Sequence, residues 1–183
     1  MKIRSIKKIW IIILIYVLFI YISLPYFPVF VAFLKNYISK DTLNILSLFF
    51  CISFFLVLSK WIYDKQYKFV QYIFIISPLI LLTYMSFSLE VWAERVHFIQ
   101  YGLLGLLVSR AYKISSFKML VVSGLLIVSV GLVDEIIQWY LPNRFGDIRD
   151  VVMNSLGGVS GLWLGQFLYW ENNYLKNIFI KNN

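Results

Sequence analysis

The residues best suited to chemistry gather in the apolar stretch GLVDEIIQWYLP. At 100° per residue of an α-helix, Asp134, Glu135 and Gln138 fall on one face, and Gly131 lies on the same face one turn earlier. Two carboxylates beside an amide could transfer a proton, hold a hard cation or bind a polar head group. Because the rest of the stretch is apolar, we expect this face to point into the protein and to find polar partners there.

A second polar face follows a few residues later. Asp150 and Asn154 share one side of the next predicted helix with a set of glycines. The glycines are Gly157, Gly158, Gly161 and Gly165. Small residues four positions apart allow another helix to approach closely, so this side is predicted to form a packing groove with polar groups at its mouth.

The loop between these two faces carries Arg144 and Asp147. Asp147 is the first acid of a D-x-x-D pattern that resembles a capping box, which predicts that it caps the second helix. The planar guanidinium group of Arg144 suits a phosphate or a carboxylate. The alternative role for Arg144 is an ion pair with one of the nearby acids.

A third polar face begins the stretch AERVHFIQYGLLGLL, where Glu94, His97 and Tyr101 lie on one side of a helix. His97 is the only histidine in the chain. Together with Asp134 and Glu135 it is a weak candidate ligand for one hard divalent ion. The alternative is a histidine that packs at a helix end without a metal, and we expect no resident cofactor.

The helices that must position these three faces have the composition of membrane spans. Of the 183 residues, 61% are hydrophobic and 14% are charged, whereas a soluble domain has about 45–50% and about 25%. This composition excludes a soluble globular enzyme. The apolar runs are Ile9–Leu24, Thr42–Ser59, Val70–Leu89, Val96–Ser109, Met119–Tyr140 and Val151–Trp170. Since a span needs about 20 residues, we predict an all-α transmembrane bundle of about six helices.

Charged residues alternate along the chain in the way that orients a multi-pass membrane protein. The N-terminus, the connections after the second and fourth runs, and the tail carry 12 of the 17 Lys and Arg residues. Seven of the 9 acidic residues lie on the other side. Because cytoplasmic loops are rich in Lys and Arg, we expect both termini on the cytoplasmic side of a bacterial cell membrane. This arrangement explains the net charge of +8 without nucleic acid as a partner.

The chain divides into three predicted parts. Residues 1–69 hold two transmembrane helices behind a basic start, residues 70–170 form a four-helix membrane core, and residues 171–183 are a short cytoplasmic tail. Pro25 and Pro28 follow the first apolar run, and they are expected to end or kink its helix.

These polar faces resemble those of the VanZ-like family of bacterial membrane proteins. The match is carried by the pattern D-E-x-x-Q…P-x-R-x-x-D-x-x-D-x-x-x-N-x-x-G-G, which runs from Asp134 to Gly158. A second match covers Glu94–Gly105, and a looser one covers Tyr21–Pro25. The resemblance implies an accessory protein of the cell envelope, and the family takes its name from a member linked to resistance to the lipid-tailed glycopeptide teicoplanin.

From the residues and the resemblance together, we expect an outward-facing polar cluster that binds or excludes an amphiphile. The amphiphile would be a lipid-linked envelope precursor or a lipoglycopeptide such as teicoplanin. The expected members of the cluster are Glu94, His97, Tyr101, Asp134, Glu135, Gln138, Arg144, Asp147, Asp150 and Asn154. One alternative is a metal- or carboxylate-dependent enzyme that acts on a lipid-linked phosphate or sugar at the outer leaflet. Another is a small transporter or flippase, since intramembrane acids can relay protons.

Overall fold

The computed structural model describes residues 3–63, 76, 77, 80, 84, 92–111, 117–142 and 146–169. Within these ranges the protein forms six helices and no strand, which agrees with the predicted all-α class. The predicted run Val70–Leu89 lies largely outside the described residues. The predicted tail after residue 170 and Arg144 lie entirely outside them.

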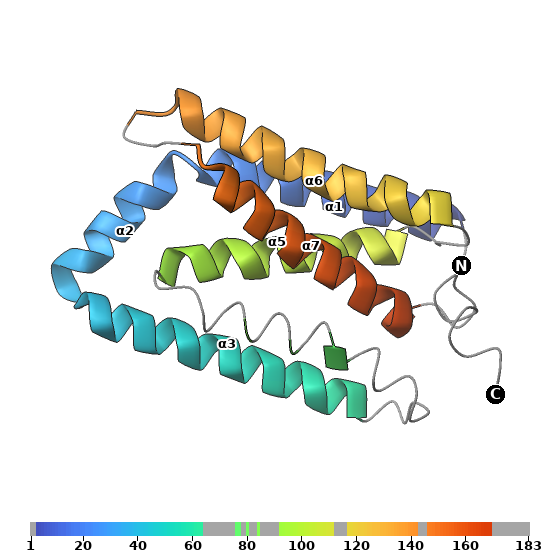
Figure 1. Cartoon of the computed structure of the whole chain (residues 1–183), viewed down its shortest axis with the longest axis horizontal. Coiled ribbons are helices and arrows are strands. Elements are labelled where there is room, and N and C mark those ends of the chain that lie inside the picture. The colour runs from blue at the N-terminus through green and yellow to red at the C-terminus, as the bar shows by residue number, and fades with distance from the viewer. Residues whose placement is uncertain are drawn as a thin grey trace.

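The helices form an antiparallel bundle. They are α1 (Ile3–Ser23), α2 (Tyr26–Tyr37), α3 (Lys40–Tyr63), α5 (Trp92–Ala111), α6 (Phe117–Tyr140) and α7 (Ile148–Tyr169). In Figure 1, α1 and α6 lie along one edge, α5 and α7 cross in the middle, and α3 lies along the opposite edge. Helices α1 and α6 run in one direction, and α3, α5 and α7 run in the other. Helix α1 therefore begins at the end of the bundle where α7 finishes (Figure 1).

The segment after α1 differs from the sequence-based expectation. The prolines end the first helix as predicted, with a turn at Leu24 and Pro25, but the chain then forms a second helix, α2, that was not predicted. Pro28 lies in the first turn of α2, where the missing N–H of proline would have no partner within the helix in any case. The two prolines therefore separate two helices rather than ending helical structure altogether.

Helix α6 buries the polar residues of its acidic motif and exposes many of its large apolar residues. Its buried residues are Ser123, Ile127, Gly131, Asp134, Glu135 and Gln138. Its exposed residues include Leu125, Leu132, Val133, Ile136 and Trp139. This is the reverse of a soluble amphipathic helix. Among the described residues, Ile6–Ser23 and Phe117–Tyr140 are the two segments long and apolar enough to cross a membrane, as judged by length and composition.

Glycines bring the backbones of α5 and α7 into contact at the centre of the bundle. A Cβ atom at Gly161 would collide with the carbonyl group of Gly102, and one at Gly105 would collide with the carbonyl group of Gly158. The predicted packing groove on α7 is therefore filled by α5, whose two glycines complete the crossing.

The same close packing extends along α7 in both directions. A Cβ atom at Gly157 would lie 2.6 Å from the carbonyl oxygen of Phe98, and one at Gly165 would lie 2.5 Å from the side chain of Ser109. Beside this second contact, Gln166 Nε2 donates a hydrogen bond to Ser109 Oγ at 2.9 Å. Both of these polar side chains are fully buried, so they join α5 to α7 far along the bundle from the acidic motif.

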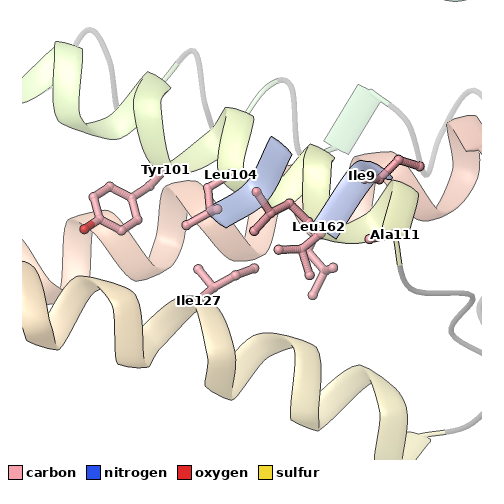
Figure 2. Close-up of a cluster of buried hydrophobic side chains, with 8 residues drawn as sticks. Ile9, Tyr101, Leu104, Ala111, Ile127 and Leu162 are labelled. Carbon is pink, nitrogen blue, oxygen red and sulfur yellow. The ribbon is translucent and has the colours of Figure 1, made fainter. Parts of the chain in front are cut away.

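An apolar core lies between the glycine crossing and α1 and α6. Ile9, Leu104, Ile127 and Leu162 pack together there, each from a different helix, and Tyr101 borders them on the side nearer the acidic motif (Figure 2). The core therefore holds α1, α5, α6 and α7 together and fixes the face that each helix presents to the polar residues.

Candidate functional site

Asp134 is the centre of the polar network. Its side chain is fully buried between helices. Tyr101 on α5 donates its hydroxyl hydrogen to Asp134 Oδ2 at 2.8 Å, and Gln138 Nε2, one turn along α6, donates to Asp134 Oδ1 at 3.3 Å. Both carboxylate oxygens therefore accept hydrogen bonds, which offsets the cost of burying this group.

Glu135 connects the network to the start of α7. Gln138 Nε2 donates a second hydrogen bond to Glu135 Oε1 at 3.1 Å, so one amide bridges the two adjacent acids. Glu135 Oε2 accepts the backbone N–H of Asp147 at 3.0 Å. Gly146 packs on the backbone of Glu135, where a Cβ atom would lie 2.8 Å from the Glu135 carbonyl oxygen. The residue before Asp147 is therefore held close to α6.

Asp147 caps α7, as its position in the sequence predicted. Its Oδ1 accepts the backbone N–H of Arg149 at 2.8 Å, and its carbonyl oxygen accepts the N–H of Asp150 at 3.0 Å. In a capping box, the acid three residues later returns a bond to the N–H of the capping residue. Here the N–H of Asp147 donates a hydrogen bond to Glu135 of the preceding helix, which joins the cap of α7 to the acidic motif.

Asn154 joins the site from α7. A Cβ atom built at Gly131 would lie 3.5 Å from Cβ of Asn154 and 3.7 Å from Cε1 of Tyr101. Gly131 on α6 therefore lies between a side chain of α7 and one of α5, and its small size keeps the three helices close. Asn154 is buried, whereas Asp147 and Arg149 are exposed and Asp150 is half-buried. The cluster thus has a buried base and a polar rim.

Tyr21 on α1 is a member of this network that the sequence analysis did not single out. Its hydroxyl donates to the carbonyl oxygen of Val130 at 3.0 Å, and the Tyr101 hydroxyl lies 3.5 Å from the same oxygen. A second tyrosine of α1, Tyr16, donates to the carbonyl oxygen of Gln100 at 3.0 Å. The short match at Tyr21–Pro25 was the sequence signal for Tyr21, but no spacing rule could pair it with α6.

His97 lies one helical turn before Tyr101 on α5 and is half-buried. Its ring meets the ring of Phe27 on α2 edge-on, with the centroids 5.6 Å apart and the planes at 74°. Within the described ranges, no three His, Cys, Asp or Glu side chains lie close enough together to hold a metal ion. Glu94 belongs to α5 by its backbone, but its side chain is outside the described residues.

Hydrogen bonds hold both acidic side chains of α6 in place. Every carboxylate oxygen of Asp134 and Glu135 accepts a hydrogen bond from a tyrosine, an amide side chain or a backbone N–H. Such a network fixes the positions of the side chains and of the turn above them. Among the residues that the structure describes at the start of α7, Asp147 and Arg149 are exposed and Asp150 is half-buried, and these three form the rim.

An apolar exterior around a buried polar network defines the protein as a helical membrane protein. The chain belongs to the VanZ/LLP1 family, whose family model matches residues 8–169. The match therefore includes the N-terminal helices as well as the acidic motif and the glycine face. A search of curated proteins and a search of solved structures gave no significant match.

Proposed function

We propose that this VanZ-like envelope protein is a non-enzymatic accessory factor of the bacterial cytoplasmic membrane that binds or excludes an amphiphile. The polar network of Tyr101, Asp134, Gln138, Glu135 and Asp147 faces the outer leaflet in this proposal. The head group of the amphiphile lies against the rim, and its acyl chain lies along the apolar exterior. Its chemistry is that of a lipid-linked envelope precursor or of a lipoglycopeptide such as teicoplanin.

One observation carries the proposal: the buried acids are hydrogen-bonded to the same turn that carries the exposed rim. Glu135 holds the N–H of Asp147, and Asp147 in turn holds the N–H of Arg149. The exposed groups at Asp147 and Arg149 therefore lie at one end of the same chain of hydrogen bonds that begins at the buried acids. The exposed Arg149 supplies a planar cation suited to phosphate or carboxylate, and the neighbouring acids supply acceptors for hydroxyl or ammonium groups.

The direction of the helices supports the proposed topology of six spans with both termini in the cytoplasm. The site lies at the end of the bundle where α6 finishes and α7 begins, opposite the start of α1 and the finish of α7 (Figure 1). The basic residues concentrate in the segments assigned to the cytoplasmic side. In this proposal residues 1–69 supply two spans, residues 70–170 supply four spans that hold most of the cluster, and residues 171–183 lie in the cytoplasm.

A binding measurement tests the function. The full-length chain in lipid nanodiscs is titrated with teicoplanin and, separately, with a lipid-linked peptidoglycan precursor. We expect at least one of them to bind, and we expect Asp134→Asn and Glu135→Gln to weaken that binding about tenfold, or 1.4 kcal/mol. Asp41→Asn is the matched control, because it also removes one acidic charge but lies at the exposed start of α3.

Equal binding by the wild-type protein and all three variants would overturn the proposal. So would a folded wild-type protein that binds neither amphiphile. Release of a product from the precursor by purified wild-type protein, lost in Asp134→Asn and His97→Ala, would establish the enzyme instead. Proton-coupled uptake into sealed vesicles would establish the transporter.

A further inference from the structure

Helix α2 is the one described helix in which no residue is buried. It has 12 residues, so it is about 18 Å long. The hydrocarbon core of a bilayer is about 30 Å thick, so α2 is too short to cross it. Its sequence is nevertheless apolar and rich in aromatic side chains, and the large exposed ones are Tyr26, Val29, Phe30, Phe33 and Tyr37.

The position of α2 in the fold places it beside the polar site. It joins the end of α1 to the start of α3 and lies obliquely across the end of the bundle where α6 finishes and α7 begins (Figure 1). Phe27 connects it to this end through the edge-on ring contact with His97 on α5. Helix α2 therefore lies at the same end of the bundle as the site, and Phe27 in its first turn contacts α5.

We propose that α2 is an interfacial helix. It lies in the outer leaflet near the level of the lipid head groups, next to the polar cluster. This inference rests on the outward orientation given under the proposed function. The occupant of its apolar surface is lipid rather than protein, because α2 directly follows α1, which is long and apolar enough to cross a membrane and which also exposes large apolar side chains near its end, at Phe19 and Ile22.

The distribution of residue types along α2 fits an interface. Aromatic side chains concentrate where hydrocarbon meets head groups. The rings of Phe33 and Tyr37 contact each other near the end of α2, with centroids 5.0 Å apart and planes tilted by 52°. Lys35 and Lys40 are both exposed and lie close to these rings in the sequence, and at an interface their ammonium groups would reach lipid phosphate. A span would instead place such lysines at two opposite surfaces.

The consequence for the site is a route of entry. An amphiphile already in the outer leaflet would meet α2 before it meets the rim at Asp147. The contact between Phe27 and His97 ties the position of α2 to the helix that also carries Tyr101. Helix α2 therefore contacts the same helix whose Tyr101 donates a hydrogen bond to Asp134.

Spin-label depth measurements test the inference. The native cysteine is first removed with Cys51→Ser, and single labels are placed at Val29→Cys, Phe30→Cys and Phe33→Cys in the full chain in liposomes. Phe50→Cys, in the middle of α3 and also exposed, is the matched control for the bilayer centre. We expect the α2 labels to be reached by oxygen in preference to a water-soluble nickel chelate, at a depth of about 5–10 Å below the head groups.

Two results would overturn the inference. Labels on α2 that are reached by the nickel chelate as readily as a label at Lys8→Cys would place the helix in water. Labels that neither reagent reaches, with dipolar coupling between labels on different molecules, would show that a second copy covers it. The depths are independent of amphiphile binding, so failure of the proposed function leaves this test intact.

Discussion

Glu135 and Asp147 are joined by a hydrogen bond from the Asp147 backbone N–H to Glu135 Oε2, at 3.0 Å across the turn between α6 and α7. The cap of α7 is thus completed by an acid of the preceding helix. Removal of the Asp147 side chain tests its half of this arrangement. We expect Asp147→Ala to lower the free energy of unfolding by about 1 kcal/mol, because the N–H of Arg149 loses its acceptor.

Asp147→Asn is the control for this prediction, because asparagine caps helices about as well as aspartate does. Unfolding in mixed micelles, followed by helical circular dichroism, measures both variants. If Asp147→Asn were as destabilised as Asp147→Ala, the carboxylate charge rather than the cap would be the stabilising feature.

The hydroxyl group of Tyr101 is predicted to be essential to the stability of the network. Tyr101→Phe leaves Asp134 Oδ2 without its buried donor. We expect a loss of about 1–3 kcal/mol, the usual cost of an unsatisfied buried polar group. Tyr140→Phe removes the same atom from an exposed side chain at the end of α6, and we expect no change in stability. Equal unfolding curves for the two variants would show that Tyr101 is not needed to hold Asp134.

The crossing of α5 and α7 is predicted to tolerate no side chain at its centre. Gly161→Ala would place a Cβ atom against the carbonyl group of Gly102, which cannot move without displacing α5. We expect a loss of about 1–3 kcal/mol or more from this overpacking. Gly124→Ala on α6 is the control, since nothing lies within 4 Å of its added carbon. The measurement is the midpoint temperature of thermal unfolding in detergent. A midpoint for Gly161→Ala equal to or higher than that for Gly124→Ala would contradict the observed packing.

The hydrogen bond between Ser109 and Gln166 is predicted to contribute modestly. A double-mutant cycle of Ser109→Ala and Gln166→Leu should give a coupling energy of about 0.6 kcal/mol, the average for hydrogen bonds between membrane helices. The measurement is the unfolding free energy of the four proteins in the cycle. A coupling energy of zero would mean that the two side chains contribute through packing alone.

Much of the fold and of the cluster was predictable because it depends on spacing within single helices. Helical periodicity alone places Asp134, Glu135 and Gln138 on one face, and the structure buries all three. The D-x-x-D pattern likewise predicts the cap at Asp147. These features are predictable because they depend on residues close together in the sequence. In an apolar helix, for example, a polar side chain is favourable only where it faces the protein interior.

The remaining features depend on contacts between helices, which the spacing of residues within one helix does not predict. Tyr21 reaches Val130 across 109 positions of the chain, and no rule of periodicity relates them. The restart of the helix after Pro25 depends on how the turn at Leu24 packs, since Leu24 is buried while α2 is not. The ring contact between Phe27 and His97 likewise joins two helices that are far apart in the sequence.

The side of the membrane that the cluster faces is the central claim, and it is open to a direct measurement. Single cysteines at Arg149 and at Lys8, each in the Cys51→Ser background, are exposed to a membrane-impermeant maleimide in spheroplasts. We expect Arg149→Cys to be labelled in intact spheroplasts, whereas Lys8→Cys should be labelled only after the membrane is opened. Labelling of Lys8→Cys from outside, with Arg149→Cys protected until the membrane is opened, would contradict it.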